Sequence, residues 1–141
     1  PLRLVGSEMC IRDRYKMGIP ARMIFNGYPL RGFEYCYPPA IKGWIEQIGG
    51  AEVVVTDSFH GLVFSLLYHR QFAVIPIANG LSSRLLDLLD LVGLENHVFT
   101  SQEELEKNME VLQRPIDYER VDSILAIYRE RSIDFLRNVL K

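Results

Sequence analysis

The chain has 141 residues and a formal net charge of −2, and 48% of its residues are apolar and 24% charged. This is the composition of one ordinary globular domain, and it excludes the disordered, collagenous and disulfide-scaffold classes. No apolar stretch approaches the roughly 20 residues of a membrane helix, so we expect a soluble protein without a transmembrane segment. Lysine and arginine are scattered, which disfavours a nucleic-acid partner but leaves small anions open. Cys10 and Cys36 lack metal-ligand spacing, so we expect no metal site and a reducing, cytoplasmic location.

The first 14 residues differ from the rest because they carry no sustained helical or strand period. Residues 5–14 resemble the translation of a sequencing adapter that recurs at the ends of metagenomic gene models, so we expect residues 1–14 to be a non-native leader. The alternative is a natural N-terminal tail. In either case residues 15–141 are expected to begin within a longer protein, of which this chain is a fragment.

The first elements expected after the leader surround a loop and a short strand. A short apolar piece at 23–25 precedes an aromatic loop at 26–39, where prolines and Asn26-Gly27 interrupt any period. Pro39 opens a helix predicted to reach about Gln47. Three consecutive valines within 52–56 then predict a strand that is buried on both faces of a parallel sheet.

Strand and helix continue to alternate along the second half. Residues 59–69 read as a helix that is apolar nearly all round, and 72–77 as a second strand. Ser82 or Ser83 caps the next helix, which ends before Gly93.

The last part of the chain predicts one more strand and two helices. A third short strand is expected at 97–99, and a capping box at 101–104 opens an acidic helix that runs to about Gln113. Residues 117–140 form a long amphipathic helix. The alternation of buried strands with helices predicts the α/β class, as a Rossmann-like parallel-sheet sandwich.

The most informative stretch is the turn Thr56-Asp57-Ser58 followed by Phe59-His60-Gly61 at the start of a helix. In parallel sheets, ligands bind beyond the carboxyl ends of the strands, where a helix N-terminus offers free N–H groups to an anion. His60 is the side chain in this turn that can move a proton near neutral pH, and Gly61 allows a ligand or a neighbouring backbone to approach closely. The alternative for His60 is a capping or packing role. Asp57 either orients His60 or caps the helix, and the capping role is favoured.

A second polar cluster at 79–84 follows the next strand, at what should be the same edge of the sheet. An arginine in a first helical turn opposes the helix dipole, so Arg84 indicates a nearby anion, with Ser83 beside it. The alternative is a surface ion pair between Arg84 and Asp87, three residues apart.

The string from Ala51 to Gly61 resembles the C-terminal half of the polysaccharide pyruvyl transferases, and the resemblance extends from about Tyr37 to Leu140. Its core, Thr-Asp-Ser-Phe-His-Gly, is fairly specific, and Phe64-Ser65, Phe72, Ser83-Arg84 and Gly93-Leu94 support it. The resemblance implies one of two Rossmann-like halves of a glycosyltransferase-B-like enzyme, with the active site in the cleft between them. The absent N-terminal half is then a necessary partner, and the fragment is expected to be inactive alone.

The resemblance also implies a reaction and roles for individual residues. Such enzymes transfer the enolpyruvyl unit of phosphoenolpyruvate to two hydroxyls of a sugar in a cell-surface polysaccharide, or in a precursor that can be lipid-linked, and leave a pyruvate ketal. His60 takes the part of the general acid. Ser58, Gly61, Ser83 and Arg84 bind the donor substrate, and no metal or other cofactor is expected. The location implied is the cytoplasm, including the inner face of the membrane.

Two other functions stay open at this stage. A glycosyltransferase-B-type sugar-nucleotide transferase shares the architecture, but Glu95 fits poorly as its ribose-binding acid. A non-catalytic α/β module that binds an anion or a partner is the other alternative, supported by the apolar stripe of the helix at 117–140.

Overall fold

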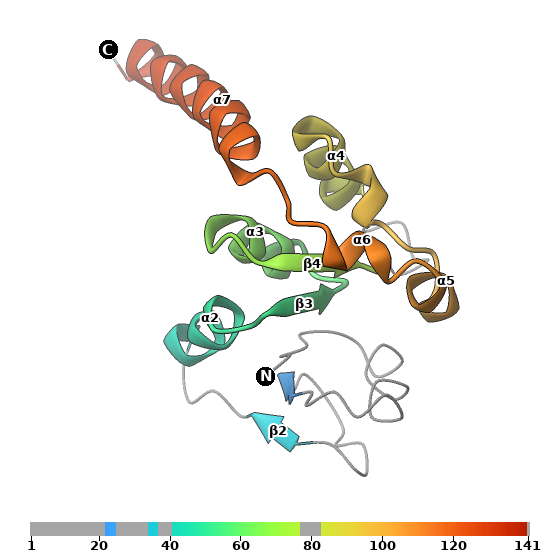
Figure 1. Cartoon of the computed structure of the whole chain (residues 1–141). Coiled ribbons are helices and arrows are strands. Elements are labelled where there is room, and N and C mark those ends of the chain that lie inside the picture. Colours follow the sequence, from blue (N-terminus) through green and yellow to red (C-terminus); the bar gives the residue numbers. More distant parts are fainter. Residues whose placement is uncertain (1–21, 25–33, 37–40, 77–82, 141) are drawn as a thin grey trace.

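The computed structural model describes residues 22–24, 34–36, 41–76 and 83–140 (Figure 1). Three predictions therefore lie outside the described residues: the leader at 1–14, Pro39 as the first residue of its helix, and Ser82 as a helix cap. The described elements are β1 (Arg22–Ile24), β2 (Glu34–Cys36), α2 (Ile41–Gly49), β3 (Val53–Thr56), α3 (Phe59–Leu67), β4 (Gln71–Val74), α4 (Ser83–Val92), the 3₁₀ helix η2 (Glu95–His97), α5 (Gln102–Lys107), α6 (Glu110–Gln113) and α7 (Tyr118–Val139).

The strands form two small parallel sheets. In one sheet β3 pairs with β4, with Val53 opposite Gln71 and Thr56 opposite Val74. In the other, β1 pairs with β2. The strand β2 corrects the prediction of a continuous loop at 26–39, because its three residues have no pattern of their own and are extended by their pairing with β1.

The β3–β4 pair is covered by helices on both faces, because successive strand residues point to opposite sides. Val54, Phe72 and Val74 face the larger core cluster, and Val53, Val55 and Ala73 face the smaller one. All four residues of β3 are buried, so the strand predicted from the valine run is confirmed. The architecture is a mixed helix and strand fold, compatible with the α/β class.

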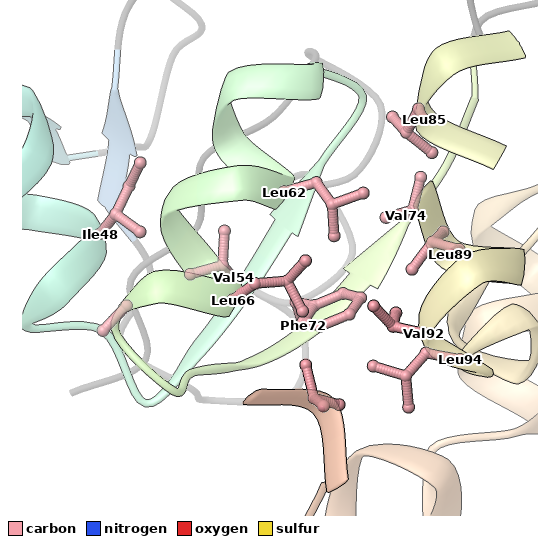
Figure 2. Close-up of a cluster of buried hydrophobic side chains, with 12 residues drawn as sticks. Ile48, Val54, Leu62, Leu66, Phe72, Val74, Leu85, Leu89, Val92 and Leu94 are labelled. Atoms are coloured by element: carbon pink, nitrogen blue, oxygen red, sulfur yellow. The ribbon is translucent and has the colours of Figure 1, made fainter. Parts of the chain in front are cut away.

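The larger cluster joins β3 and β4 to α2, α3, α4 and the beginning of α7 (Figure 2). The smaller cluster is closed by Phe99, Leu105 and Leu112 from the α5–α6 region. The buried members of the larger cluster are Ile48, Ala51, Val54, Leu62, Leu66, Phe72, Val74, Leu85, Leu89, Val92, Leu94 and Val121.

The third strand predicted at 97–99 does not form as a strand. His97 belongs to η2, and Val98 makes one isolated parallel bridge to Val74. The ring of His97 is buried, and its Nδ1 lies 2.8 Å from the carbonyl oxygen of Phe72. A side chain therefore occupies a carbonyl of β4 that a backbone N–H of a third strand could have used. Only the Phe99 N–H, at 2.9 Å from the Val74 oxygen, extends the ladder.

The acidic helix predicted from 101 to about 113 is divided into α5 and α6 at Asn108. The Asn108 side-chain amide donates to the Glu104 carbonyl at 2.7 Å, and such local bonds compete with continuation of the helix. The predicted cap is confirmed, since the Ser101 hydroxyl accepts from the Glu104 N–H at 3.2 Å. The Glu104 carboxylate accepts from the hydroxyl and the N–H of Thr100, and these bonds lower the pKa of Glu104.

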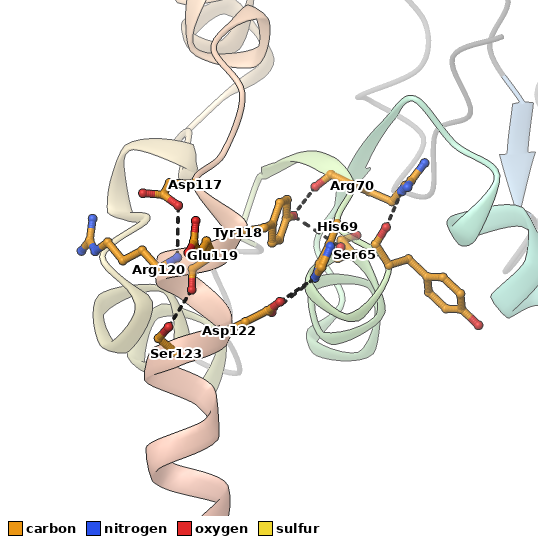
Figure 3. A network of polar contacts seen from close by, with 10 residues as sticks. Ser65, His69, Arg70, Asp117, Tyr118, Glu119, Arg120, Asp122 and Ser123 are labelled. Carbon is orange, nitrogen blue, oxygen red and sulfur yellow. Dashed lines mark hydrogen bonds and ion pairs between the residues drawn. The ribbon is translucent and has the colours of Figure 1, made fainter.

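The long terminal helix is confirmed as α7, with Asp117 as its N-cap. Its first turn is attached to the end of α3 (Figure 3). The Tyr118 hydroxyl donates to the Arg70 carbonyl, and the Tyr118 ring stacks on His69 with centroids 4.5 Å apart. His69 Nε2 lies 3.0 Å from a carboxylate oxygen of Asp122. Burial raises the pKa of Tyr118, so its hydroxyl stays a donor.

Beyond this attachment α7 extends away from the sheet and its helices (Figure 1). Its second half exposes large apolar side chains, including Phe135 at 65% and Val139 at 63% of their surface. None of the helices in the described ranges has both the length and the apolar character needed to cross a membrane.

Candidate anion site at the carboxyl edge of the sheet

The predicted site residues lie at one edge of the β3–β4 sheet. The strand β3 ends at Thr56 and leads into α3 at Phe59, while β4 ends at Val74 and precedes α4 at Ser83. Because the two strands are parallel, their carboxyl ends share an edge. The structure thus places the beginnings of α3 and α4 as the sequence predicted.

The turn between β3 and α3 is held by two side-chain hydrogen bonds. The buried Thr56 Oγ1 accepts from the Ser58 N–H at 3.0 Å, and the Ser58 hydroxyl accepts from the Gly61 N–H at 3.4 Å. The N–H groups of Phe59 and His60 find no acceptor within the described part of the chain. Two donors that have no acceptor among the described residues, together with the positive end of the helix dipole, therefore lie at this edge of the sheet.

The capping role favoured for Asp57 is wrong, because Ser58 is the N-cap of α3. Ser58 has the extended backbone and the short hydroxyl that a cap requires, whereas Asp57 precedes it in the turn. Within the described ranges Asp57 makes no hydrogen bond to His60, so the orienting role has no geometric support. The Ser58 hydroxyl is used by the cap, since it accepts from the Gly61 N–H. Its contact with a substrate stays a prediction.

Gly61 is buried where α3 passes closest to β3. A Cβ atom at this position would lie 2.3 Å from Thr56 Oγ1, well inside any real contact distance. The Ser65 hydroxyl donates to the Gly61 carbonyl at 2.7 Å from one turn further along. The close neighbour of Gly61 is the side chain of Thr56 and not the neighbouring backbone that was expected, which gives Gly61 a packing role; its contact with a ligand stays a prediction.

The three histidines of the chain differ in their partners. His97 is buried on the Phe72 carbonyl, and burial lowers its pKa. His69 is paired with Asp122 and stacked on Tyr118. His60 is exposed, and its imidazole has no hydrogen-bond or ion-pair partner among the described residues. It is therefore the histidine available to a ligand.

The ring of Phe59 contacts both side chains that were predicted to handle a ligand, and Phe59 was not predicted from the sequence as a site residue. The Arg84 guanidinium carbon lies 5.3 Å from the centroid of the Phe59 ring. The His60 ring meets the same ring edge-on, with centroids 6.0 Å apart. The described residues include no ion pair between Arg84 and Asp87, and Ser83 lies exposed beside Arg84. The contact with His60 is between neighbours in the sequence, whereas nothing in the spacing of the residues signals the contact of Arg84 with Phe59, which joins α4 to α3.

No group of three or more histidine, cysteine, aspartate or glutamate side chains with metal-binding geometry occurs in the ranges that the structure describes. The predicted site residues that the structure describes at this edge offer one imidazole, one guanidinium and the N–H groups at the start of α3. This combination suits a small anion whose conversion needs a proton transfer.

The described residues form a mixed helix and strand fold, compatible with the α/β class, with a candidate anion site at the carboxyl edge of its parallel strands. The family model for polysaccharide pyruvyl transferase matches residues 6–79, just over half of the chain. The chain belongs to the polysaccharide pyruvyl transferase family, as the resemblance of its Thr56–Gly61 motif predicted, and this membership indicates a transferase that acts on polysaccharide. No curated protein and no solved structure was found to match it. The matched range contains Phe59 and His60 and ends before Arg84.

Proposed function

We propose that the chain takes part in the transfer of a pyruvyl group from phosphoenolpyruvate to two hydroxyls of a sugar in a cell-surface polysaccharide or its precursor. The observation that carries this proposal is His60, exposed and unpartnered within the described residues, at the N-terminus of α3 inside the region matched by the family model. The product is a cyclic pyruvate ketal, with phosphate released.

Phosphoenolpyruvate carries a phosphate and a carboxylate, and this edge of the sheet offers donors for both. The Phe59 and His60 N–H groups point out of the first turn of α3, and the Arg84 guanidinium is held on the Phe59 ring. Arginine binds planar or tetrahedral oxyanions through two parallel N–H donors. The helix terminus and Arg84 together would therefore hold the donor and stabilise the departing phosphate.

The reaction requires one proton to be placed on carbon. The His60 imidazolium donates a proton to C3 of phosphoenolpyruvate, which turns the methylene into a methyl group and makes C2 electrophilic. An acceptor hydroxyl oxygen bonds to C2, and its proton returns to the imidazole. The C2–O bond to phosphate then breaks, the second hydroxyl oxygen bonds to C2, and its proton leaves with the phosphate. Histidine suits this step because its imidazole can both donate and accept a proton at a ring nitrogen.

The wider architecture belongs to the same proposal. Helices on both faces of a parallel strand pair support a Rossmann-like half-domain. Such a half would face a second half across a cleft, as in glycosyltransferase-B-like enzymes, and the second half would supply further anion-binding side chains. We place the reaction in the cytoplasm, including the inner face of the membrane, where phosphoenolpyruvate and sugar precursors meet.

Calorimetric titration of the chain with phosphoenolpyruvate tests the donor directly. We expect saturable binding that His60→Ala and Arg84→Ala weaken without changing the circular dichroism spectrum. His69→Ala is the matched control, because this histidine is engaged with Asp122 at the far end of α3 and its loss should leave the affinity unchanged. Binding of a UDP-sugar in place of phosphoenolpyruvate, or equal weakening by all three variants, would contradict the proposal.

A further inference from the structure

We propose that Phe59 is a positioning residue of this site: its ring holds the Arg84 cation and contacts the His60 imidazole at the carboxyl edge of the sheet. The two contacts are 5.3 Å from the guanidinium carbon to the ring centroid and 6.0 Å between the two ring centroids. The substrate named in the binding test below rests on the proposed function, whereas the side-chain geometry does not.

Arg84 is placed where a helix by itself would repel it. It is the second residue of α4, so its positive charge lies in the first turn, at the positive end of the helix dipole. Within the described residues, no carboxylate forms an ion pair with it. The negative face of an aromatic ring attracts a cation within about 6 Å. The Phe59 ring is thus the partner that determines where the guanidinium lies.

Phe59 also joins the two helices that carry the site. It is the first residue of α3 and is partly buried, with its ring packed at the margin of the larger core cluster. The same ring lines a groove with Leu88 of α4. Contacts with the larger core cluster and with α4 restrict the ring, and a restricted ring in turn restricts the side chains that contact it. His60 and Arg84 are 24 positions apart in the sequence, and both side chains contact the same ring.

If the side chain at position 59 served only to pack against the core, any apolar side chain of similar volume would be sufficient. Leucine would supply comparable volume and would lack the quadrupole that attracts the cation. The neighbouring core positions of α3, Leu62 and Leu66, are leucines and are almost fully buried, whereas Phe59 is only partly buried. A substitution of Phe59 by leucine therefore distinguishes a positioning role from a packing role.

The chain offers a matched control in Phe64. This residue lies in the same helix and is also partly buried against the larger core, where its ring meets Trp44 at 5.5 Å in a T-shaped contact. Phe64→Leu therefore costs a similar aromatic contact and packing volume, and among the described residues no ring-stacking or cation–π contact joins Phe64 to Arg84 or His60.

The first measurement is the ¹H shift of the Arg84 side chain by NMR in the chain without ligand. Ring currents should shift the Arg84 Hδ and Hε protons upfield in the wild type and in Phe64→Leu. In Phe59→Leu these protons should move to the ordinary arginine range. Unchanged Arg84 shifts in a folded Phe59→Leu variant would overturn the proposal, whether or not phosphoenolpyruvate binds.

The second measurement is the dissociation constant for phosphoenolpyruvate. Phe59→Leu should raise it about 2- to 5-fold, the loss of one exposed cation–π contact, while Phe59→Trp should keep it near the wild-type value. In an Arg84→Ala background, Phe59→Leu should lose most of its effect, because only the contact with His60 then remains. An undiminished effect in that background, or an equal effect of Phe64→Leu, would overturn the positioning role. Absence of phosphoenolpyruvate binding by the wild type contradicts the proposed function instead, and the NMR shifts then decide the role of Phe59.

Discussion

Replacing Gly61 by alanine tests the packing that sets the position of the whole site. The added Cβ atom would lie 2.3 Å from Thr56 Oγ1, 3.1 Å from Thr56 Cβ and 3.3 Å from Thr56 Cγ2. Thr56 is fully buried on β3 and β-branched, so it has few ways to move aside. Either the first turn of α3 shifts outward, or the Thr56 side chain rotates.

The magnitude follows from three contributions. Overpacking a well-filled interior costs about 1–3 kcal/mol. Rotation of Thr56 would in addition lose its hydrogen bond from the Ser58 N–H, a bond of 3.0 Å with a typical contribution of about 0.5–1.5 kcal/mol. Alanine regains at most about 1 kcal/mol over glycine in a helix. We therefore expect Gly61→Ala to lower the free energy of unfolding by about 0.5–3.5 kcal/mol.

Urea denaturation followed by circular dichroism measures this change, provided that the transition is two-state. Thr56→Ala removes Oγ1 and Cγ2 and leaves the Cβ at 3.1 Å, so Gly61→Ala should cost much less stability in that background than in the wild type. Gly49→Ala is the matched control, because its Cβ would only approach the ring of the partly exposed Tyr68, at 3.1 Å. Equal destabilisation by Gly61→Ala with and without Thr56 would refute the clash as the cause. Unchanged stability with lost phosphoenolpyruvate binding would instead make Gly61 a site of ligand approach.

Two further predictions concern parts of the chain away from the site. Burial lowers the pKa of His97 below 6.5, so the unfolded state binds more protons and stability should fall as the pH drops below about 6.5, by up to about 1.4 kcal/mol per pH unit. His97→Asn should remove this part of the slope in urea titrations at pH 5 to 7, and an identical slope would contradict a buried neutral imidazole. The exposed Phe135 and Leu136 should cause self-association at rising concentration in light scattering, which F135K/L136K should abolish without lowering stability; a monomeric wild type would argue against an unpaired apolar face.

Features with a strong local cause were predictable from the sequence. Three consecutive valines sufficed for β3, because β-branched residues between turn formers favour a buried strand. Gly93 was expected to end α4, and it adopts the left-handed φ of 67° that glycine accepts without strain. Ser101 and Asp117 likewise act as caps through bonds within three residues of themselves. Each of these signals is complete within one turn of chain.

Features that depend on distant partners were not predictable in the same way. The residues at 97–99 have strand-like composition, but the bond from His97 to the Phe72 carbonyl, 25 positions away, replaces a ladder contact. His69 ends α3 in the left-handed region at a φ of 52°, a conformation that favours glycine. Its ring is retained there by Tyr118 and Asp122, about 50 positions downstream. Only the folded chain brings those partners together.

The candidate site also contains both features that depend on local sequence and features that depend on distant partners. A helix N-terminus after a buried strand is a local property, so His60 and the free N–H groups of α3 could be predicted from residues 53–61 alone. The position of Arg84 is a tertiary property, because it depends on a ring of another helix. The family match has the same boundary, since it includes Phe59 and His60 but ends before Arg84. If the ring of Phe59 fixes the guanidinium, a change at position 59 inside the matched region should control the behaviour of a residue outside it.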